Sequence, residues 1–407
     1  MTKALFGLPE QVVFCKRCVI SNQRPNSTVE FKNVKNEEKA TINFDEDEIC
    51  DACKYQDSKA SNIDWNKRED ALKSLCDLHR NDNGDYDVIV PGSGGKDSAY
   101  ASHVLKYKYG MNPLTVTWAP HKYTEIGWKN FENWIHEGGL DNILFTPNGK
   151  LHKYLTKEAF TNLLHPFQPF IVGQRIIGPM MAAKFNVKLV FYGENQAEYG
   201  NNVDENYIPT MDKKFFSVDD PMDIMLGGKS IRDIIDETDF KLNDFKPYIP
   251  PKAEYLESKG VQVHYLGYYL PWDPQECYYY ATENTGFQSN SERTEGTYSK
   301  YSSIDDKIDM FHYLTTLVKF GIGRATYDAA QEIRNNKITR EEGVQLVRKF
   351  DQEFPNKYFK DFLEYVSLSE SEFHNILDEF RSPHLWEKLD GEWALKHAVW
   401  HNQKRLK

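Results

Sequence analysis

The chain has 407 residues, 40% of them hydrophobic and 27% charged, which is typical of a globular protein with two or three structural units. Its 61 acidic and 50 basic residues give a net charge of −11. Proteins that grip a nucleic-acid backbone usually carry a basic excess, so this balance argues against nucleic acid as a partner.

No targeting or membrane segment stands out. The N-terminal stretch MTKALFGLPEQVVFCKRC has no apolar core with a small-residue cleavage site, and no later stretch is apolar over the length of a bilayer-spanning helix. We therefore expect a cytoplasmic protein without membrane insertion.

Residues 1–60 contain two CxxC pairs, Cys15 with Cys18 and Cys50 with Cys53, joined by a stretch too polar to form a core alone. Four thiolates suit a tetrahedral Zn²⁺ ion, whose binding would supply the missing folding energy. The spacing predicts a structural zinc ribbon over residues 1–60. An iron–sulfur cluster and a redox pair remain alternatives.

Strand-like and helix-like segments alternate over residues 61–275. Apolar runs typical of buried strands stand at 88–90, 112–120, 142–147, 187–193 and 261–269, and helical spacing at 126–139 and 170–186. This alternation predicts an α/β fold with a doubly wound, mostly parallel sheet.

The segment from Pro91 to Ser98, PGSGGKDS, stands where the first of these strands gives way to a helix. Consecutive glycines let the backbone approach a phosphate, their N–H groups form an anion nest, and the helix N-terminus adds its positive end. A Walker loop or a dinucleotide-binding turn requires a different spacing. The segment therefore predicts a phosphate loop of another class rather than an ordinary turn.

The loop resembles the PP-loop, SGGxDS, of the ATP pyrophosphatases, which include GMP, NAD and asparagine synthetases and tRNA thiolases. The resemblance implies cleavage of ATP between its α- and β-phosphates. Asp97 would act with Mg²⁺ on the charge that leaves as pyrophosphate, and Lys96 is a second catalytic candidate. The implied ATP-binding residues in the loop are Pro91, Ser93, Gly94, Gly95, Lys96, Asp97 and Ser98.

Two further strand ends should lie at the same sheet edge. Thr117 and Trp118 end the second strand, where doubly wound proteins place adenine, although Trp118 fits the core equally well. Gly193 and Glu194 follow the strand KLVFYG. Glu194 is a candidate magnesium ligand and catalytic or substrate-contacting residue, with a solvated loop acid as the alternative.

After about Tyr280 the strand-like runs stop. Helical periodicity appears at 304–321, 325–337, 339–354 and 369–383, with capping boxes at Thr339/Glu342 and Ser369/Glu372. We expect residues 276–407 to form a helical domain that closes the substrate cleft.

Several longer stretches, among them TWAPHKYTEIGW, HPFQPFIVGQR, YGENQAEYG, YYLPWDPQE, GTYSKYSSIDDKID and KFGIGRATYDAAQEIRNNKITREE, are similar to the N-acetyl sugar amidotransferase family of bacterial surface-polysaccharide biosynthesis. The resemblance covers nearly the whole chain, including both CxxC pairs. It implies an enzyme that uses ATP, Mg²⁺ and ammonia to convert an acetamido group of a nucleotide sugar or nonulosonic acid into an acetamidino group. The sugar, its carrier and the oligomeric state stay open.

The source of ammonia should be a separate protein. Cys76 and Cys277 stand in no G-x-C-x-G elbow, so the chain shows no glutaminase nucleophile of its own. The family resemblance implies a glutaminase partner similar to that of histidine biosynthesis, with a companion similar to its cyclase subunit.

Two groups of residues are candidates for substrate binding, each with a structural or solvated role as the alternative. The polar-aromatic segments expected at the cleft offer hydrogen bonds and stacking for a sugar. The helical region offers cations for a phosphate. The candidates are His121, Tyr123, Gln168 and Gln174 in the first group and Lys300, Lys307, Lys319 and Arg324 in the second.

Two rival functions share the loop. A tRNA sulfur transferase would use the same adenylation step, but it predicts a basic RNA-binding face and a catalytic cysteine. A zinc-ribbon scaffold with a vestigial ATP site is the second rival, although the loop retains every functional residue type.

Overall fold

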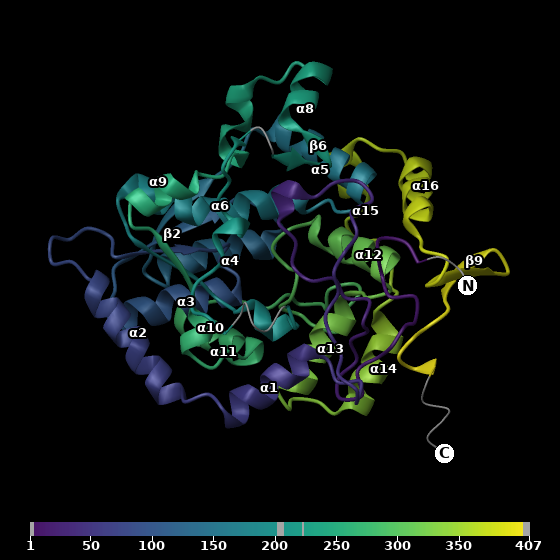
Figure 1. Ribbon diagram of the computed structural model, residues 1–407, viewed down its shortest axis with the longest axis horizontal. Coiled ribbons are helices and arrows are strands. Elements are labelled where there is room, and N and C mark those ends of the chain that lie inside the picture. The colour runs from purple at the N-terminus through teal and green to yellow at the C-terminus, as the bar shows by residue number, and fades with distance from the viewer. Residues whose placement is uncertain (1–3, 202–206, 222–223, 402–407) are drawn as a thin grey trace.

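The computed structural model describes residues 4–201, 207–221 and 224–401 (Figure 1). At its centre lies a five-stranded sheet in the order β3-β2-β1-β4-β7, in which every neighbouring pair runs parallel. Each strand falls on one of the predicted runs, which confirms the predicted fold class. The strands are β1 (Val88–Pro91), β2 (Pro113–Trp118), β3 (Asp141–Phe145), β4 (Leu189–Tyr192) and β7 (Gln262–Tyr265).

The direction of strand addition reverses at β1. β2 and β3 lie on one side of it, and β4 and β7 lie on the other. In open α/β sheets, ligands bind in the crevice outside the carboxyl ends of the strands at such a reversal. The predicted phosphate loop directly follows β1 and therefore stands at this point.

Helices cover both faces of the sheet because successive strand residues point to opposite sides. Ile89 packs in one core with α5 (Gly149–Leu163) and α6 (Gln168–Phe185). Val88 and Val90 pack in another core on the opposite face. The helices of that second layer are α2 (Trp65–His79), α3 (Lys96–Tyr107), α4 (Glu125–His136) and α11 (Pro274–Thr285).

The connection from β4 to β7 consists of short elements. They are η2 (Gln196–Tyr199), η3 (Lys213–Phe215), β5 (Met225–Leu226), β6 (Lys229–Ser230), α8 (Ile231–Glu237), η5 (Leu242–Tyr248) and α9 (Ala253–Ser258). After β7 the chain turns into α10 (Leu266–Tyr269), where Gly267 N donates to Gly193 O over 2.9 Å. The predicted run 261–269 is therefore partly strand and partly helix.

The last third of the chain is mainly helical, as predicted. Its helices are α12 (Asp309–Phe320), α13 (Arg324–Arg334), α14 (Arg340–Phe350), α15 (Phe359–Val366) and α16 (Glu370–Phe380). The capping boxes at Thr339 and Ser369 are both present.

The expectation that strands stop after Tyr280 is wrong at the end of this region. β8 (Trp386–Leu389) and β9 (Glu392–Leu395) form an antiparallel hairpin. Asp390 and Gly391 connect them with φ angles of 52° and 90°. An Asp-Gly pair with positive φ at both residues is the turn that a two-residue hairpin requires.

The N-terminal segment packs against the C-terminal helices. It contains η1 (Glu30–Lys32) and α1 (Asp51–Ser61). Val19, Ile20 and Ile42 share a core with residues of α12, α13 and α14, and Figure 1 shows this segment, in purple, beside those helices. Residues far apart in the sequence thus bury the few apolar side chains of a polar segment. The domain boundaries at 60/61 and 275/276 stay predictions.

Within the described ranges, no helix combines the length and the apolar character needed to cross a membrane.

Candidate active site and metal centre

The phosphate loop joins β1 to α3 at the carboxyl edge of the sheet. α3 begins at Lys96, and its N-cap, Gly95, has no side chain that could accept a hydrogen bond from the first helical turn. The free N–H groups of a helix N-terminus attract an anion. The loop therefore leaves the N-terminus of α3 open to an anion, and its binding of phosphate stays a prediction.

Gly94 allows the loop to lie directly on α4. Its φ is +83°, and a Cβ at this position would be 2.8 Å from the Cα of Phe131. Both the backbone conformation and the close contact therefore require glycine. Gly95 differs, since the nearest atom to a Cβ there is the Ser93 Oγ at 3.6 Å, an ordinary contact.

We expect Gly94→Ala to destabilise the fold by about 1–3 kcal/mol, because alanine would be forced into the left-handed region against a backbone neighbour. Gly95→Ala is the matched control and should keep the melting temperature of the natural protein. Thermal unfolding of the two variants checks this, and equal stabilities would contradict the close packing of Gly94.

Three charged side chains meet beside the loop. The Lys96 Nζ lies 2.6 Å from Asp97 Oδ2. Burial, which would lower the pKa of Lys96, is outweighed by Asp97 and other nearby groups, so this pKa is raised. Glu194, after β4, accepts a hydrogen bond from the Tyr199 hydroxyl. Burial raises the pKa of Glu194 to about 6, and the charge of Asp97 acts in the same direction.

The Asp97 and Glu194 carboxylates fit a divalent cation. Asp97 Oδ1 is buried, and within the described chain it has no hydrogen-bond partner. A carboxylate oxygen without a partner, near a second carboxylate whose charge burial disfavours, is the arrangement that a Mg²⁺ ion would stabilise. The residues predicted as magnesium ligands therefore lie in suitable surroundings.

A cavity of about 320 Å³ opens in front of the loop. Ser93, Gly94, Gly95, Lys96 and Asp97 line one side, and a stretch of the C-terminal region lines the other. The opposite wall consists of Tyr301, Ser302, Ser303, Ile304, Asp305, Asp309, Tyr313 and Arg324. The C-terminal region thus lines this cavity together with the loop, and its closure of a substrate cleft stays a prediction.

Asp305 and Asp309 are site residues that sequence reasoning missed. Asp305 Oδ2 accepts from the Ser93 hydroxyl over 3.0 Å, and burial, followed by the charge of Asp306, raises the pKa of Asp305. Burial raises the pKa of Asp309 to about 7, although Arg324 acts against it. Their only sequence signal is the acidic run in SSIDDKID, which resembles an exposed helix start.

Arg324 and Gln174 are the predicted substrate residues that line the cavity. The Arg324 Nε lies 3.0 Å from Asp328 Oδ1, and its Nη1 donates to the Tyr313 hydroxyl. Arg324 and Lys96 also line a smaller adjoining pocket of about 30 Å³ with Glu332 and Lys337. Arg324 is therefore placed to reach an anion bound at the loop.

The prediction that His121 and Gln168 face the cleft is wrong. Nδ1 of the buried His121 side chain lies 2.8 Å from Asp306 Oδ2. Gln168 is fully buried and bonds to main-chain atoms of Glu30, Met225 and Gly227. Both side chains form hydrogen bonds or ion pairs with groups from distant parts of the chain.

Tyr123 also lies outside the residues that line the cavity. Its ring packs edge-on against Trp128 with centroids 5.1 Å apart. Its main chain forms an isolated bridge with Asp306. Tyr123 thus belongs to the contact between the sheet domain and the C-terminal wall.

Three predicted phosphate-binding lysines have other roles. The Lys300 Nζ donates to Ser291 O over 2.9 Å, and the Lys307 Nζ lies 3.2 Å from Asp361 Oδ1. Lys319 is buried, its Nζ donates to Leu163 O over 2.8 Å, and burial lowers its pKa to about 7. None of the three lines the described cavity, which corrects their assignment to the substrate.

The predicted adenine-binding residues lie in the core. Thr117 is fully buried and accepts from Asn142 Nδ2 over 3.0 Å. A Cβ on Gly173 would come within 2.2 Å of the Trp118 ring, so α6 packs directly on it. The core alternative therefore holds for Trp118. Gly193 packs against the Trp272 ring, since a Cβ on Gly193 would lie 2.8 Å from that ring. Glu194 follows it directly in the chain.

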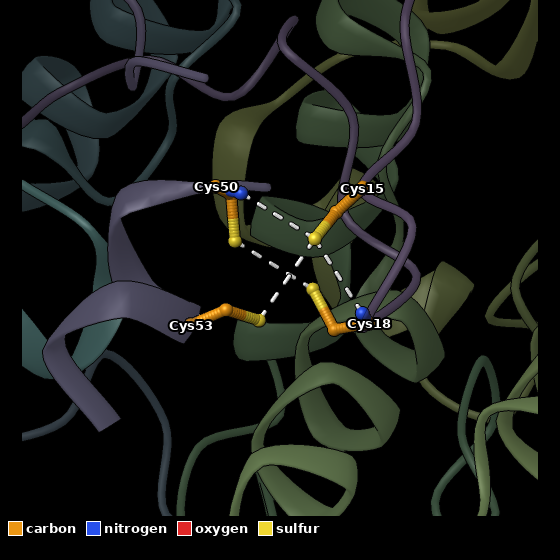
Figure 2. A group of neighbouring side chains, drawn as sticks. All are labelled: Cys15, Cys18, Cys50 and Cys53. Carbon is orange, nitrogen blue, oxygen red and sulfur yellow. Dashed lines mark hydrogen bonds between the residues drawn. The ribbon is translucent and has the colours of Figure 1, made fainter. Parts of the chain in front are cut away.

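The four paired cysteines converge (Figure 2). All are buried, and their Sγ atoms lie within 4.8 Å of one another. The Cys15–Cys53 and Cys18–Cys50 Sγ separations are 3.8 and 3.7 Å. A tetrahedral ion with bonds of about 2.3 Å to sulfur places its ligands about 3.8 Å apart. In an iron–sulfur cluster the four cysteines bind two or four different irons, so the four sulfurs would not all lie this close together.

The C-terminal region holds the first cysteine pair from outside. Arg340, the first residue of α14, donates from Nε to Cys18 O over 3.1 Å and from Nη2 to Cys15 O over 3.2 Å. The side chain thus satisfies two main-chain carbonyls of the knuckle. The four-cysteine candidate metal site therefore lies at the contact between the N-terminal segment and the C-terminal helices.

Comparison with known proteins identifies the C-terminal region. Residues 295–400 match the family model "LPS biosynthesis protein WbpG-like, C-terminal domain", and no curated protein sequence matches the chain. Two solved structures share low similarity with it. The U34-tRNA thiolase NcsA from Methanococcus maripaludis, with its [4Fe-4S] cluster, is 10% identical, with a TM-score of 0.32 over 83% of this chain and 88% of that one. The NMN synthetase from Francisella tularensis is 13% identical, with a TM-score of 0.27 over 70% and 97%.

The match covers α12 to α16, the β8–β9 hairpin and the stretch before α12 that lines the cavity. It therefore includes Asp305, Asp309 and Arg324, the residues that face the phosphate loop. Residues 295–400 are thus similar to a WbpG-like C-terminal domain of LPS biosynthesis, which fits the family that the sequence motifs suggest.

Proposed function

We propose that the protein is an ATP-using PP-loop enzyme of LPS biosynthesis that acts as an N-acetyl sugar amidotransferase. The observation that carries the proposal is a phosphate loop and a WbpG-like domain that face each other across one cavity. An adenylating loop opposite a wall from a polysaccharide-biosynthesis family fits the activation of a sugar substituent.

In the proposed reaction, the acetamido oxygen attacks the α-phosphorus of ATP, the bond to the β-phosphate breaks, and pyrophosphate leaves. Ammonia then adds to the activated carbon and loses a proton, and the carbon–oxygen bond to AMP breaks. The product is an amidinium cation. Positioning and charge neutralisation dominate such a nucleotidyl transfer, so no covalent nucleophile is needed.

The loop residues supply the first step. The main-chain N–H groups of the loop and Lys96 hold the β- and γ-phosphates, and Arg324 reaches the triphosphate from the opposite wall. Asp97 and Glu194 would hold a Mg²⁺ ion, which neutralises the charge that leaves as pyrophosphate.

The acidic wall suits the second step. The acetamido substrate is neutral, whereas ammonium and the amidinium product are cations. Asp305 and Asp309 place two carboxylates on the wall opposite the loop, and Phe287 and Ile304 give the same cavity an apolar part that fits an acetyl methyl group. Carboxylates beside the reacting carbon would accept the proton and stabilise the cation.

The two single cysteines argue against sulfur transfer. Cys76 and Cys277 are 1% and 2% exposed, and burial raises the pKa of both thiols. A buried protonated thiol is a poor nucleophile. Ammonia, rather than sulfide carried on a cysteine, therefore fits these residues better. We propose a separate glutaminase, with its cyclase-like companion, as the source of the ammonia.

An oxygen label tests the proposal directly. The protein is incubated with Mg-ATP, ammonium and N-acetylated nucleotide sugars or nonulosonic acids whose acetyl oxygen is ¹⁸O. We expect AMP, pyrophosphate and a product with NH in place of oxygen, and the label should appear in AMP. Product formation with unlabelled AMP would contradict adenylation of the acetamido oxygen. Formation of thiolated tRNA from tRNA and sulfide would favour the rival function.

A further inference from the structure

Helix α1 leads from the metal centre to the segment that carries Glu194. Cys50 is its N-cap, Cys53 lies in its first turn, and Lys59 lies near its end. The buried Lys59 Nζ donates to Glu198 Oε1 and Oε2 over 2.8 and 3.0 Å and to Trp272 O over 2.8 Å. An ammonium group has three protons to donate, and the Lys59 ammonium has three acceptor atoms within the protein.

Glu198 belongs to the same short segment as Glu194. The segment folds into η2, and Tyr199, the neighbour of Glu198, donates its hydroxyl proton to Glu194. The Nη2 of the buried Arg334 donates to Glu198 O over 3.0 Å. The orientation of Glu194 beside the loop therefore depends on a segment that Lys59 and Arg334 hold in place.

The first turn of α1 also packs directly on this segment. Gly200 has a φ of +78°, and a Cβ there would stand 3.0 Å from Ala52 N, between the two cysteines of the second pair. Asn201 continues the contact, since its Oδ1 accepts from Ser27 N over 3.1 Å. The metal-binding segment thus contacts residues 198–201 along their length.

We propose that Lys59 and Glu198 form a positioning pair, through which the geometry fixed at the four cysteines sets the orientation of Glu194 and the affinity of the ATP site for Mg²⁺. The inference rests on the proposed function only in that Glu194 binds the magnesium of ATP. A buried ion pair with good geometry fixes the register of two elements, and residues that orient a metal ligand typically change metal affinity by about 10–100-fold.

Lys59→Met in the full chain, with Lys54→Met as control, tests the pair. Lys54 lies on the same helix, and its surface ion pair with Asp45 spans 3.3 Å. Zinc content is measured by metal analysis, and ATP binding by calorimetry over a range of Mg²⁺ concentrations. We expect Lys59→Met to keep its zinc but to require about 10-fold more Mg²⁺ for half-maximal ATP binding. Lys54→Met should match the natural protein.

An unchanged Mg²⁺ requirement, or loss of zinc in Lys59→Met, would overturn the inference. If Lys59→Met does not fold, Tyr199→Phe takes its place, because it keeps the ion pair and removes only the hydroxyl on Glu194. It should raise the Mg²⁺ requirement in the same direction, and no change would overturn the inference. Binding of Mg-ATP needs no sugar, so a natural protein that binds Mg-ATP but forms no amidine would contradict the proposed function alone.

Discussion

Asp97→Asn should leave the protein folded while lowering substrate-dependent pyrophosphate release by on the order of 100-fold. The amide keeps an acceptor for Lys96, but it removes the negative charge beside the partnerless Oδ1. The site would then lose a magnesium ligand at the point where negative charge must leave. Release of pyrophosphate from Mg-ATP and substrate measures the effect.

The control for this prediction is Asp70→Asn. Asp70 is an exposed carboxylate on α2 that pairs with Lys73 over 3.0 Å, and surface pairs of this kind contribute little. The control should match the natural protein in both activity and melting temperature. Full pyrophosphate release by a folded Asp97→Asn variant would contradict the role of Asp97 in the mechanism.

Local patterns predicted the parts of the site that depend on local geometry. A phosphate loop requires glycines, a preceding strand and a following helix, all of which are contiguous in PGSGGKDS. The cysteine pairs can also be recognised from local sequence, since each knuckle is a four-residue unit and four thiolates together suit one metal ion. The pair Asp390-Gly391 carries an equally local hairpin signal, although it follows a long series of helical segments.

Long-range pairing could not be predicted in this way. Polar residues such as His121 and Gln168 look like cleft residues in sequence, yet their partners Asp306 and Glu30 are 185 and 138 positions away. Lys59 resembles any other helix-surface lysine, and its partner Glu198 is 139 positions distant. A buried polar group is distinguished from a functional one by its partners, and the partners come from the tertiary fold.

The same reasoning applies to the wall of the cavity. Asp305 faces the loop because its backbone rests on α4, where a Cβ on Gly127 would come within 2.5 Å of the Asp305 Cα. Asp306 accepts from His121 N over 2.7 Å and fixes the turn. Contacts between segments so distant in sequence bring two acids to the loop, although neither has a recognisable motif.

Cys50→Ser should remove the metal and destabilise the protein by more than about 4 kcal/mol, well beyond the usual effect of one substitution. Structural zinc supplies about 10–16 kcal/mol of apparent binding free energy in small domains. In this chain that energy would hold a polar segment whose few apolar residues share a core with α12, α13 and α14. Loss of the metal should therefore loosen the C-terminal helices as well as the N-terminal segment.

Metal analysis and thermal unfolding of Cys50→Ser, with Cys76→Ala as control, measure this. Cys76 is buried in a different core, so its replacement should cost packing energy but keep one zinc ion per chain. Full zinc content in Cys50→Ser would contradict the four-cysteine site. Iron and sulfide in the natural protein, with the visible absorption of a cluster, would show that the four cysteines bind an iron–sulfur cluster and not zinc. The short Sγ separations argue against that outcome, because one ion fits between the four sulfurs and several irons do not.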